Sequence, residues 1–505
     1  MTNKKFKLAA MSLATAVAVS TVGPSASAVT YYLGDGSVTV DKDDDGAYSY
    51  QVKEGESADG SDSTRTYVND DTPDNGVIYV KDGHKPTETA PPTTDNSDNG
   101  TEVPIPTDHT TDSSGNNAEN SSTSETTTTN TITVKEDVTG ATIVVEGVNV
   151  DTSTSTDTQA EVSADTKEDK TIIKVGEGAD VDLTVKDSNL TTGGNGIDIG
   201  VNLKDDDENK KTNVDLTLDH TEINLTEKDN TAGIVVRDNS KVDVTLKGEN
   251  TIDGEKALEE AAKEADGNPS PNRNVEGIRV GGENAGDDSK GKGASLTIKG
   301  DENSEQGSLN IDRTSTGMVI SDGSDVTLTD NADVDINNTE AGSTTQGGRG
   351  IVQRGDLTVE DKSSLTIDTV GSGAYKIDNN QEGLVYGNNG YGIDSTDDIT
   401  VTGDSTLEIK ETEGSAIYGG TGSSLTVKDS TLDIDGNGKG IDYESGAGDI
   451  TFEDSKVNIS GNGMGIAVAS NGGTNITFDH STGSVSAQNG TCLLYTSPSP
   501  RDYAA

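Results

Sequence analysis

Short triplets that read apolar, Thr, apolar recur along most of the chain, and apolar and polar positions alternate through and around them. This period of two is typical of short β-strands with one buried face. Triplets beginning at Leu425, Ile450 and Ile476 are spaced by 25 and 26 residues, whereas earlier spacings are longer and irregular. The triplets begin at Ile132, Leu183, Leu216, Val244, Leu296, Val326, Leu357, Ile399, Leu425, Ile450 and Ile476.

Two further patterns keep step with the triplets. A Gly-Ile pair or a close variant precedes most of them, as at Gly392-Ile393, and another alternating segment follows, as in STLEI ending at Ile409. Gly, Asn, Asp and Ser fill the positions between, where tight turns need them. One such three-strand repeat cannot bury its apolar face alone, but stacked repeats can. The pattern therefore predicts an all-β fold, a right-handed parallel β-helix with three strands and about 25 residues per coil.

The composition raises the question of disorder. Only 29% of the residues are hydrophobic, and there is no tryptophan. Such a chain cannot build a core of aromatic rings. In a solenoid, however, Ile, Val and Leu of successive coils stack on one another, and each buried aliphatic side chain contributes roughly 1.5–3 kcal/mol. The periodicity therefore favours a folded chain.

The repeats assign residues 129–491 to the solenoid and leave other segments at the N-terminus. Residues 1–28 hold three lysines, a short apolar run and Ala26-Ser27-Ala28, which predict a secretory signal peptide rather than a retained membrane helix. Residues 29–82 predict three strands, an N-terminal β region or a cap on the first coil. Residues 83–128 are rich in Pro, Thr, Ser and Asp, which predicts a linker or a disordered insertion.

The C-terminal residues differ from everything before them. The segment CLLYTSPSPRD closely resembles a translated sequencing adapter, so we interpret residues 492–505 as an assembly artefact. They include the only cysteine, Cys492. On this interpretation the natural sequence has no cysteine in the part present, which excludes disulfides and Cys-based metal sites there. We expect the natural chain to continue and to carry its means of attachment beyond this point.

Two insertions interrupt the regular spacing. GEKALEEAAKEADGNPSP, between Val244 and Leu296, predicts a short helix that ends at Gly and Pro. GSGAYKIDNNQEGLVYGNNG, between Leu357 and Ile399, predicts an exposed loop. Both are expected at turns, where added residues leave the stack of coils intact.

The chain is strongly acidic, with a formal net charge of −53. Such a surface repels phosphate and anionic lipid, so we expect no nucleic-acid partner and no direct membrane insertion in the part present. Acidic residues occur at almost every turn, which makes any single pair weak evidence for catalysis. Asp397-Asp398 is the one pair in a short turn beside a strand, and no His or Arg flanks it.

One acidic segment has the spacing of a metal loop. DKDDDG places Asp41, Asp43 and Asp45 at alternate positions before a glycine, as in the first half of a calcium loop. The position where a bidentate Glu usually closes such a loop is Val52, and strands flank the segment. Two interpretations stay open, a calcium site or an acidic turn. Calcium is the only cofactor that the sequence suggests.

Two other motifs are interpreted without a function. Arg354-Gly355-Asp356 matches an integrin-binding tripeptide, but it lies in a short turn of a chain rich in Gly and Asp, so we treat it as a chance match. His220 and His480 both follow an apolar-Thr-apolar triplet and are interpreted as turn residues.

Several tyrosines fall within a few coils. A tyrosine ring offers a flat apolar face and a hydroxyl group, which suits a sugar ring. They predict a carbohydrate-binding surface, and the alternative is that they pack on neighbouring loops. The residues are Tyr375, Tyr386, Tyr391, Tyr418 and Tyr443.

Two phenylalanines test the proposed register. Phe452 and Phe478 occupy the same position of consecutive triplets. If the coils stack as predicted, their rings should lie with centroids about 4.5–7 Å apart.

Over about residues 129–490 the Gly-Ile, Leu-Thr-Val and Ser-x-Leu-x-Ile pattern resembles the pectate-lyase-like β-helix superfamily. It is most similar to secreted bacterial β-helix proteins and to autotransporter adhesin passengers. The resemblance specifies a fold better than a function. Enzymes of the superfamily cleave polysaccharides with calcium-bound carboxylates and a basic residue, or with clustered aspartates.

The resemblance implies an exported bacterial protein, secreted or at the cell surface, with an adhesive or structural role and no catalysis. The first alternative is a carbohydrate-binding protein, and the second is a polysaccharide lyase or glycosidase. The implied partners are an extracellular polysaccharide or a host surface glycan.

Overall fold

A computed structural model provides the structure of the chain. The predicted signal peptide, residues 84–126 of the predicted linker and residues 496–505 lie outside the described residues. The residues described are 29–42, 48–53, 64–68, 77–83, 127–153, 170–203, 210–263, 274–282, 293–301, 307–337, 339, 348–368, 370–371, 374–376, 384–386, 390–469 and 474–495.

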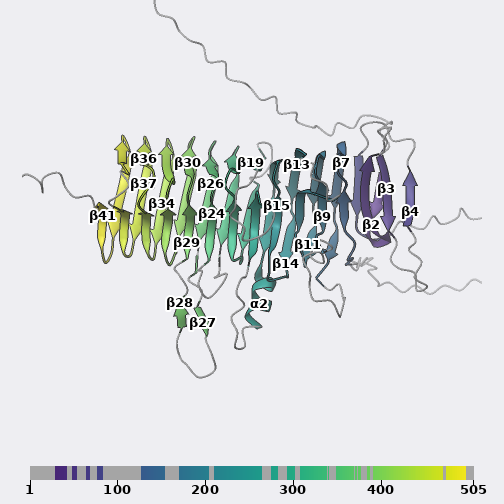
Figure 1. Ribbon diagram of the computed structural model, residues 1–505, viewed down its shortest axis with the longest axis horizontal. Helices are drawn as coiled ribbons and strands as arrows, with labels where there is room; N and C mark the ends of the chain where they lie inside the picture. Colours follow the sequence, from purple (N-terminus) through teal and green to yellow (C-terminus); the bar gives the residue numbers. More distant parts are fainter. Residues whose placement is uncertain are drawn as a thin grey trace, which may run out of the picture.

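The described chain winds into a solenoid of three long sheets (Figure 1). One coil contributes a strand to each sheet in turn, as in β32 (Ser415–Gly419), β33 (Ser424–Lys428) and β34 (Thr431–Gly436). Each strand pairs in parallel with its counterpart in the next coil, so that Leu425 lies beside Ile450, and Ile450 beside Ile476. The predicted parallel β-helix with three strands per coil is confirmed.

Sheet A has 13 strands and holds the apolar-Thr-apolar triplets of the solenoid from Leu183 onward. Its strands are β1 (Val29–Tyr32), β5 (Val77–Lys81), β7 (Thr139–Glu146), β10 (Asp180–Lys186), β13 (Thr212–Asp219), β16 (Ser240–Lys247), β19 (Ser295–Gly300), β22 (Asp325–Thr329), β25 (Asp356–Val359), β30 (Asp398–Thr402), β33, β36 (Ile450–Glu453) and β39 (Ile476–Asp479).

Sheet B has 15 strands and holds the Gly-Ile pairs. Its strands are β4 (Thr64–Val68), β3 (Tyr48–Lys53), β2 (Ser37–Lys42), β6 (Ile132–Val134), β9 (Ile173–Gly176), β12 (Ile197–Val201), β15 (Thr231–Val236), β18 (Val275–Val280), β21 (Thr316–Ile320), β24 (Arg349–Gln353), β29 (Tyr391–Ser395), β32, β35 (Lys439–Tyr443), β38 (Met464–Val468) and β41 (Thr491–Tyr495).

Sheet C has 11 strands and holds the third segment of each repeat. Its strands are β8 (Asn149–Asp151), β11 (Asn189–Thr192), β14 (Glu222–Leu225), β17 (Glu249–Asp253), β20 (Ser308–Asp312), β23 (Asp333–Asn337), β26 (Ser364–Asp368), β31 (Thr406–Lys410), β34, β37 (Lys456–Gly461) and β40 (Thr482–Ala487).

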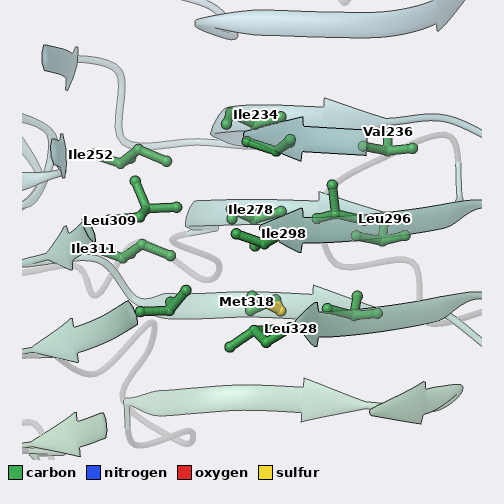
Figure 2. Packing of buried hydrophobic residues seen from close by; sticks show 14 of the residues in the cluster. Ile234, Val236, Ile252, Ile278, Leu296, Ile298, Leu309, Ile311, Met318 and Leu328 are labelled. Carbon is green, nitrogen blue, oxygen red and sulfur yellow. The ribbon is translucent and has the colours of Figure 1, made fainter. Parts of the chain in front are cut away.

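The core consists of aliphatic columns that run along the solenoid. In sheet B, Ile234 lies beside Ile278, and Ile278 beside Met318, in three successive coils. Figure 2 shows these side chains and those of the other sheets in a common interior. Gly277 illustrates why a glycine precedes the first inward residue of many sheet B strands. A Cβ atom there would lie 2.3 Å from the Ile311 side chain of sheet C, so the two sheets could not approach as closely.

The corner between sheets A and C repeats one backbone feature in many coils. A single residue takes a positive φ, with values of 48° at Asp187, 54° at His220, 49° at Asp429 and 49° at His480. Asp and Asn tolerate this conformation better than most residues. The interpretation of both histidines as turn residues is confirmed.

The register predicted from the two phenylalanines is also confirmed. Phe452 lies beside Phe478 in neighbouring strands, and their ring centroids are 4.8 Å apart with the planes tilted by 35°. Phe452 is fully buried, whereas Phe478 is 50% exposed in the last coil of sheet A. The aromatic pair thus continues the aliphatic column into that coil.

The N-terminal region joins the solenoid directly. Three strands were predicted in residues 29–82. The described part of this region holds five, β1 to β5, together with the short 3-10 helix η1 (Leu33–Asp35). Strands β1 and β5 pair in parallel within sheet A. Strands β2, β3 and β4 pair in antiparallel fashion and extend sheet B beyond its first parallel pair, β2 and β6.

Both predicted insertions lie in connections from sheet C to sheet B, and Figure 1 shows them on the same side of the solenoid. The first contains the predicted helix, α2 (Glu255–Lys263), whose Leu258 is buried. Arg313 of the next coil forms an ion pair of 2.7 Å with Glu255. The second is not a plain loop, because β27 (Ala374–Lys376) and β28 (Leu384–Tyr386) form an antiparallel pair in it.

The C-terminal strand, β41, begins at Thr491 and continues into the residues from 492 onward that we interpreted as an assembly artefact. In β41, Leu493 lies beside Ile466 of β38 in parallel register. The strand ends at Tyr495, three residues before Pro498, which has no backbone N–H to donate. Among the described residues, no helix has the length and apolar character that spanning a membrane requires.

Candidate functional site

Two of the five predicted tyrosines come together on the outer face of sheet B. Tyr391 of β29 and Tyr418 of β32 stack with centroids 4.8 Å apart and an interplanar angle of 18°. Both side chains are half-buried. Since one face of each ring lies against the other ring, the pair offers less free aromatic face than two separate tyrosines would.

Charged groups surround this tyrosine pair. The carboxylate of Asp394, on β29, accepts a hydrogen bond of 3.2 Å from Nη1 of Arg354. It also forms an ion pair of 3.3 Å with Nη1 of Arg349. Nη1 of Arg354 also donates to the backbone carbonyl of Asp394 at 2.8 Å. The arginine of the RGD tripeptide is therefore folded back onto the next coil, with its side chain only 18% exposed.

The hydroxyl groups of the pair stay protonated at neutral pH. Burial, followed by the charge of Asp394, raises the pKa of Tyr391. Burial also raises the pKa of Tyr418, and a hydrogen bond to Glu444 raises it further. A neutral phenol can donate one hydrogen bond and accept another. The Tyr418 proton is engaged by Glu444, so toward a sugar hydroxyl Tyr418 acts as an acceptor.

The other three predicted tyrosines do not join the pair. Tyr443 is 1% exposed, and its hydroxyl accepts a hydrogen bond of 3.4 Å from Ser423, so it is a core residue and not part of a surface. Tyr375 and Tyr386 lie on β27 and β28, where their backbones face Val385 and Ala374, and their side chains lie outside what the structure describes.

A second cluster lies at the corner that leads from sheet B into sheet A. One carboxylate oxygen from each of Asp356, Asp397 and Asp398 lies within 4.8 Å of the others. Asp325 lies beside Asp356 in the preceding coil. We call these four residues the aspartate corner. The sequence reasoning noted the pair at 397 and 398 and the RGD tripeptide separately, and it missed that they meet.

Aligning the triplets would have revealed this cluster. Asp325, Asp356 and Asp398 each stand immediately before a triplet, so a parallel stack must bring them into one column. Burial, followed by the charge of Asp397, raises the pKa of both Asp325 and Asp356. The backbone N–H of Asp398 donates to the Asp397 carboxylate at 2.9 Å, and the Ser424 hydroxyl contacts the Asp398 carboxylate.

Carboxylate oxygens are the ligands that calcium prefers, so the aspartate corner fits the donor type of the calcium sites that the resemblance implies. Lyase chemistry in that superfamily also needs a basic residue. The guanidinium group closest in sequence belongs to Arg354, which is bound to Asp394. The corner therefore has carboxylates for binding or acid–base chemistry, but Arg354 is already engaged elsewhere.

The calcium motif near the N-terminus is described only in part. Asp41 is the first residue of the motif, and Asp43 and Asp45 lie outside the described residues. The Asp41 carboxylate pairs with Lys135 at 2.7 Å and accepts the backbone N–H of Lys42 at 2.9 Å. Strands β2 and β3, on either side of the motif, pair in antiparallel fashion. A calcium ion at Asp41 would compete with Lys135.

Comparisons with protein-family models, with curated proteins and with solved structures find no match to this chain. The architecture alone therefore defines its class, a parallel β-helix with three sheets.

Proposed function

We propose that this chain is an exported bacterial protein, secreted or held at the cell surface, with an adhesive or structural role and no catalysis. The main support is the continuity of the three sheets, which extend through 13, 15 and 11 strands. A solenoid of this kind is an extended body that offers a long surface and positions the loops inserted between its strands. The resemblance to adhesin passengers agrees with this role.

The outer face of sheet A supports the same proposal. Seven successive coils carry a threonine at one outward position, which gives a regular, polar column along the solenoid. Regularity of this kind suits a spacer or a long contact surface better than a catalytic cleft. The residues are Thr297, Thr327, Thr358, Thr400, Thr426, Thr451 and Thr477.

Adhesion is tested by coupling the purified chain to beads and measuring their retention under flow. The surfaces are cultured epithelial cells and films of plant or bacterial polysaccharide. We expect retention above that of beads carrying an acidic protein of similar net charge, because charge alone gives no specific contact. Retention equal to that control on every surface would count against an adhesive role.

Carbohydrate binding is the first alternative, and the Tyr391–Tyr418 pair favours it. Affinity electrophoresis through gels that contain single polysaccharides measures it directly. The double variant Tyr391→Ala, Tyr418→Ala should lose any retardation that the unaltered chain shows. Tyr79→Ala is the matched control, because Tyr79 is also half-exposed but lies in the first coils, on sheet A. If the double variant were retarded as much as the unaltered chain, the tyrosine pair would not be part of the binding surface.

A lyase or glycosidase is the second alternative, favoured only by the aspartate corner. Two carboxyl groups about 5–5.5 Å apart are typical of retaining glycosidases. Release of reducing ends or of unsaturated products from polysaccharides, lost in Asp356→Asn, would establish it.

A further inference from the structure

Sheet A has a continuous column of threonines on its outer face. Each member pairs directly with the next in parallel register, as Thr358 does with Thr400, and Thr400 with Thr426. Since neighbouring strands lie about 4.7–4.9 Å apart, the column extends over roughly 28–29 Å. We call it the threonine ladder, and its members are Thr297, Thr327, Thr358, Thr400, Thr426, Thr451 and Thr477.

The hydroxyl groups of the ladder are open to solvent and held in position. Thr358, Thr400 and Thr426, in the middle of the ladder, are half-exposed. Among the residues that the structure describes, no other group of the protein is hydrogen-bonded to the hydroxyl of any of these three. A β-branched side chain on a strand that is paired on both sides has few rotamers, so binding it costs little entropy. The ladder therefore offers a preorganised row of hydroxyl and methyl groups.

The spacing of the ladder restricts the kind of polymer that fits along it. An extended polypeptide advances about 3.3 Å per residue, and a nucleic-acid strand advances about 3.4 Å per nucleotide. Neither repeat keeps step with the coils. The sugar rings of a ribbon-like polysaccharide, such as a cellulose chain, follow one another at a repeat only slightly longer than the strand spacing of about 4.7–4.9 Å. A few neighbouring coils can therefore each meet one ring of the same chain.

Charge restricts the polymer further. Asp325, Asp356 and Asp398 each stand two positions before a threonine of the ladder, so they lie on the same face of sheet A. Together with the formal net charge of −53, this acidic column repels polymers that carry carboxylate, sulfate or phosphate groups. The ladder therefore fits an uncharged polysaccharide better than an anionic one.

We propose that the threonine ladder binds an uncharged, ribbon-like polysaccharide that lies along sheet A, with a sugar ring over each engaged coil. The threonine hydroxyls exchange hydrogen bonds with the hydroxyl groups of the sugar, and the threonine methyl groups contact the apolar C–H face of its ring. This inference rests on the adhesive role proposed above and names its partner. It assigns the contact to sheet A, whereas the Tyr391–Tyr418 pair lies on sheet B.

Affinity electrophoresis of the whole chain tests the proposal with three polymers, in the presence of EDTA. Hydroxyethyl cellulose is uncharged and ribbon-like, carboxymethyl cellulose has the same backbone with added carboxylates, and dextran is uncharged but flexible. Hydroxyethyl cellulose should retard the chain, and dextran should not. Carboxymethyl cellulose should retard it only at high salt, where the repulsion between carboxylates is screened. Unchanged mobility in hydroxyethyl cellulose, or equal retardation in dextran, would overturn the proposal.

The decisive variant is the triple substitution Thr358→Val, Thr400→Val, Thr426→Val. It removes three adjacent hydroxyl groups and keeps β-branched side chains of the same shape, which suit a strand. Each lost hydrogen bond at an exposed site should weaken binding about two- to threefold, so the three together should weaken it roughly ten- to thirtyfold. If the triple variant does not fold, Thr400→Val alone gives the same test with the smaller factor.

The matched control is the triple substitution Thr366→Val, Thr406→Val, Thr431→Val. These three threonines are also half-exposed and outward-facing, but they lie on sheet C. The control should be retarded as much as the unaltered chain. Equal retardation of the ladder variant and the control would show that the ladder does not bind the polysaccharide.

Two further comparisons separate this proposal from the others. The double variant of Tyr391 and Tyr418 should still be retarded by hydroxyethyl cellulose, and loss of retardation there would assign binding to sheet B and overturn the ladder. In the bead assay, retention of the ladder variant equal to that of the unaltered chain on polysaccharide films would contradict the ladder but leave the adhesive role standing. Ladder-dependent retardation in gels, without retention of beads on any surface, would support the ladder and contradict the adhesive role.

Discussion

A ladder of serines lines the inside of the corner between sheets A and C, and removing one hydroxyl should measurably loosen a single coil. The backbone N–H of Ser363 donates to Oγ of Ser405 at 3.1 Å. The backbone N–H of Ser405 donates in the same way to Ser430 at 3.2 Å, and that of Ser430 donates to Ser455 at 3.3 Å. Each coil therefore satisfies a buried N–H of the coil before it.

The substitution Ser405→Ala removes one acceptor from this ladder. Ser405 is 1% exposed, so water cannot easily replace the lost oxygen. The N–H of Ser363 would then keep only its bond of 3.2 Å to the backbone carbonyl of Glu360, and the loss of the shorter bond should cost about 0.5–1.5 kcal/mol. The N–H of Ser405 itself keeps its bond to Ser430, so the defect should stay local, since stability in a solenoid is close to a sum over neighbouring coils.

Urea unfolding and hydrogen exchange measure this loss together. We expect a lower unfolding midpoint, with faster exchange concentrated in β26 and β31. Ser364→Ala is the matched control, because Ser364 lies beside Thr406 in the neighbouring strand and is half-exposed and outward-facing. Ser405→Thr keeps a hydroxyl and should recover part of the loss. If Ser405→Ala and Ser364→Ala differed by less than about 0.5 kcal/mol, the reasoning that buried N–H groups depend on this ladder would be wrong.

Three further predictions follow from packing between coils. A Cβ atom at Gly419 would lie 2.4 Å from the Tyr443 ring, so Gly419→Ala should cost about 1–3 kcal/mol by thermal unfolding, and adding Tyr443→Leu should restore part of it. Phe452→Ala removes a fully buried ring and should lower the free energy of unfolding by about 3–5 kcal/mol. Phe478→Ala, at a half-exposed site, should lower it clearly less, and equal losses in urea unfolding would contradict the observed burial. In hydrogen exchange, β39 and β40 should be less protected than β33 and β34, because their side chains are largely exposed; equal protection would refute this.

The architecture of the solenoid could be predicted from the sequence by itself. Apolar and polar positions alternate within each short strand, and this pattern places Ile450 and Phe452 on the same inward face of one strand. Repetition of the pattern then sets the register, which is why the stacking of Phe452 on Phe478 could be predicted. Helix α2 was also predictable, because its helix-forming residues and its Gly and Pro stop are contiguous.

The same alternation could have corrected one prediction. Tyr418 directly follows the inward Ile417, so it faces outward, whereas Tyr443 lies two positions after the inward Ile441 and faces the core. Sequence reasoning grouped the tyrosines by proximity and ignored this difference in phase. It could not show that there is room for Tyr443, because that room depends on Gly419 of the preceding coil.

Only the tertiary structure decided which outward side chains meet. Asp356 and Asp398 are 42 positions apart, with the insertion that contains β27 and β28 between them, yet stacking brings their carboxylates together. Arg354 could have faced the same carboxylates but reaches Asp394 instead. The physical reason is that strand periodicity is local and is enforced by burial, whereas the neighbours of an outward side chain come from other coils, across connections whose lengths the core does not restrict.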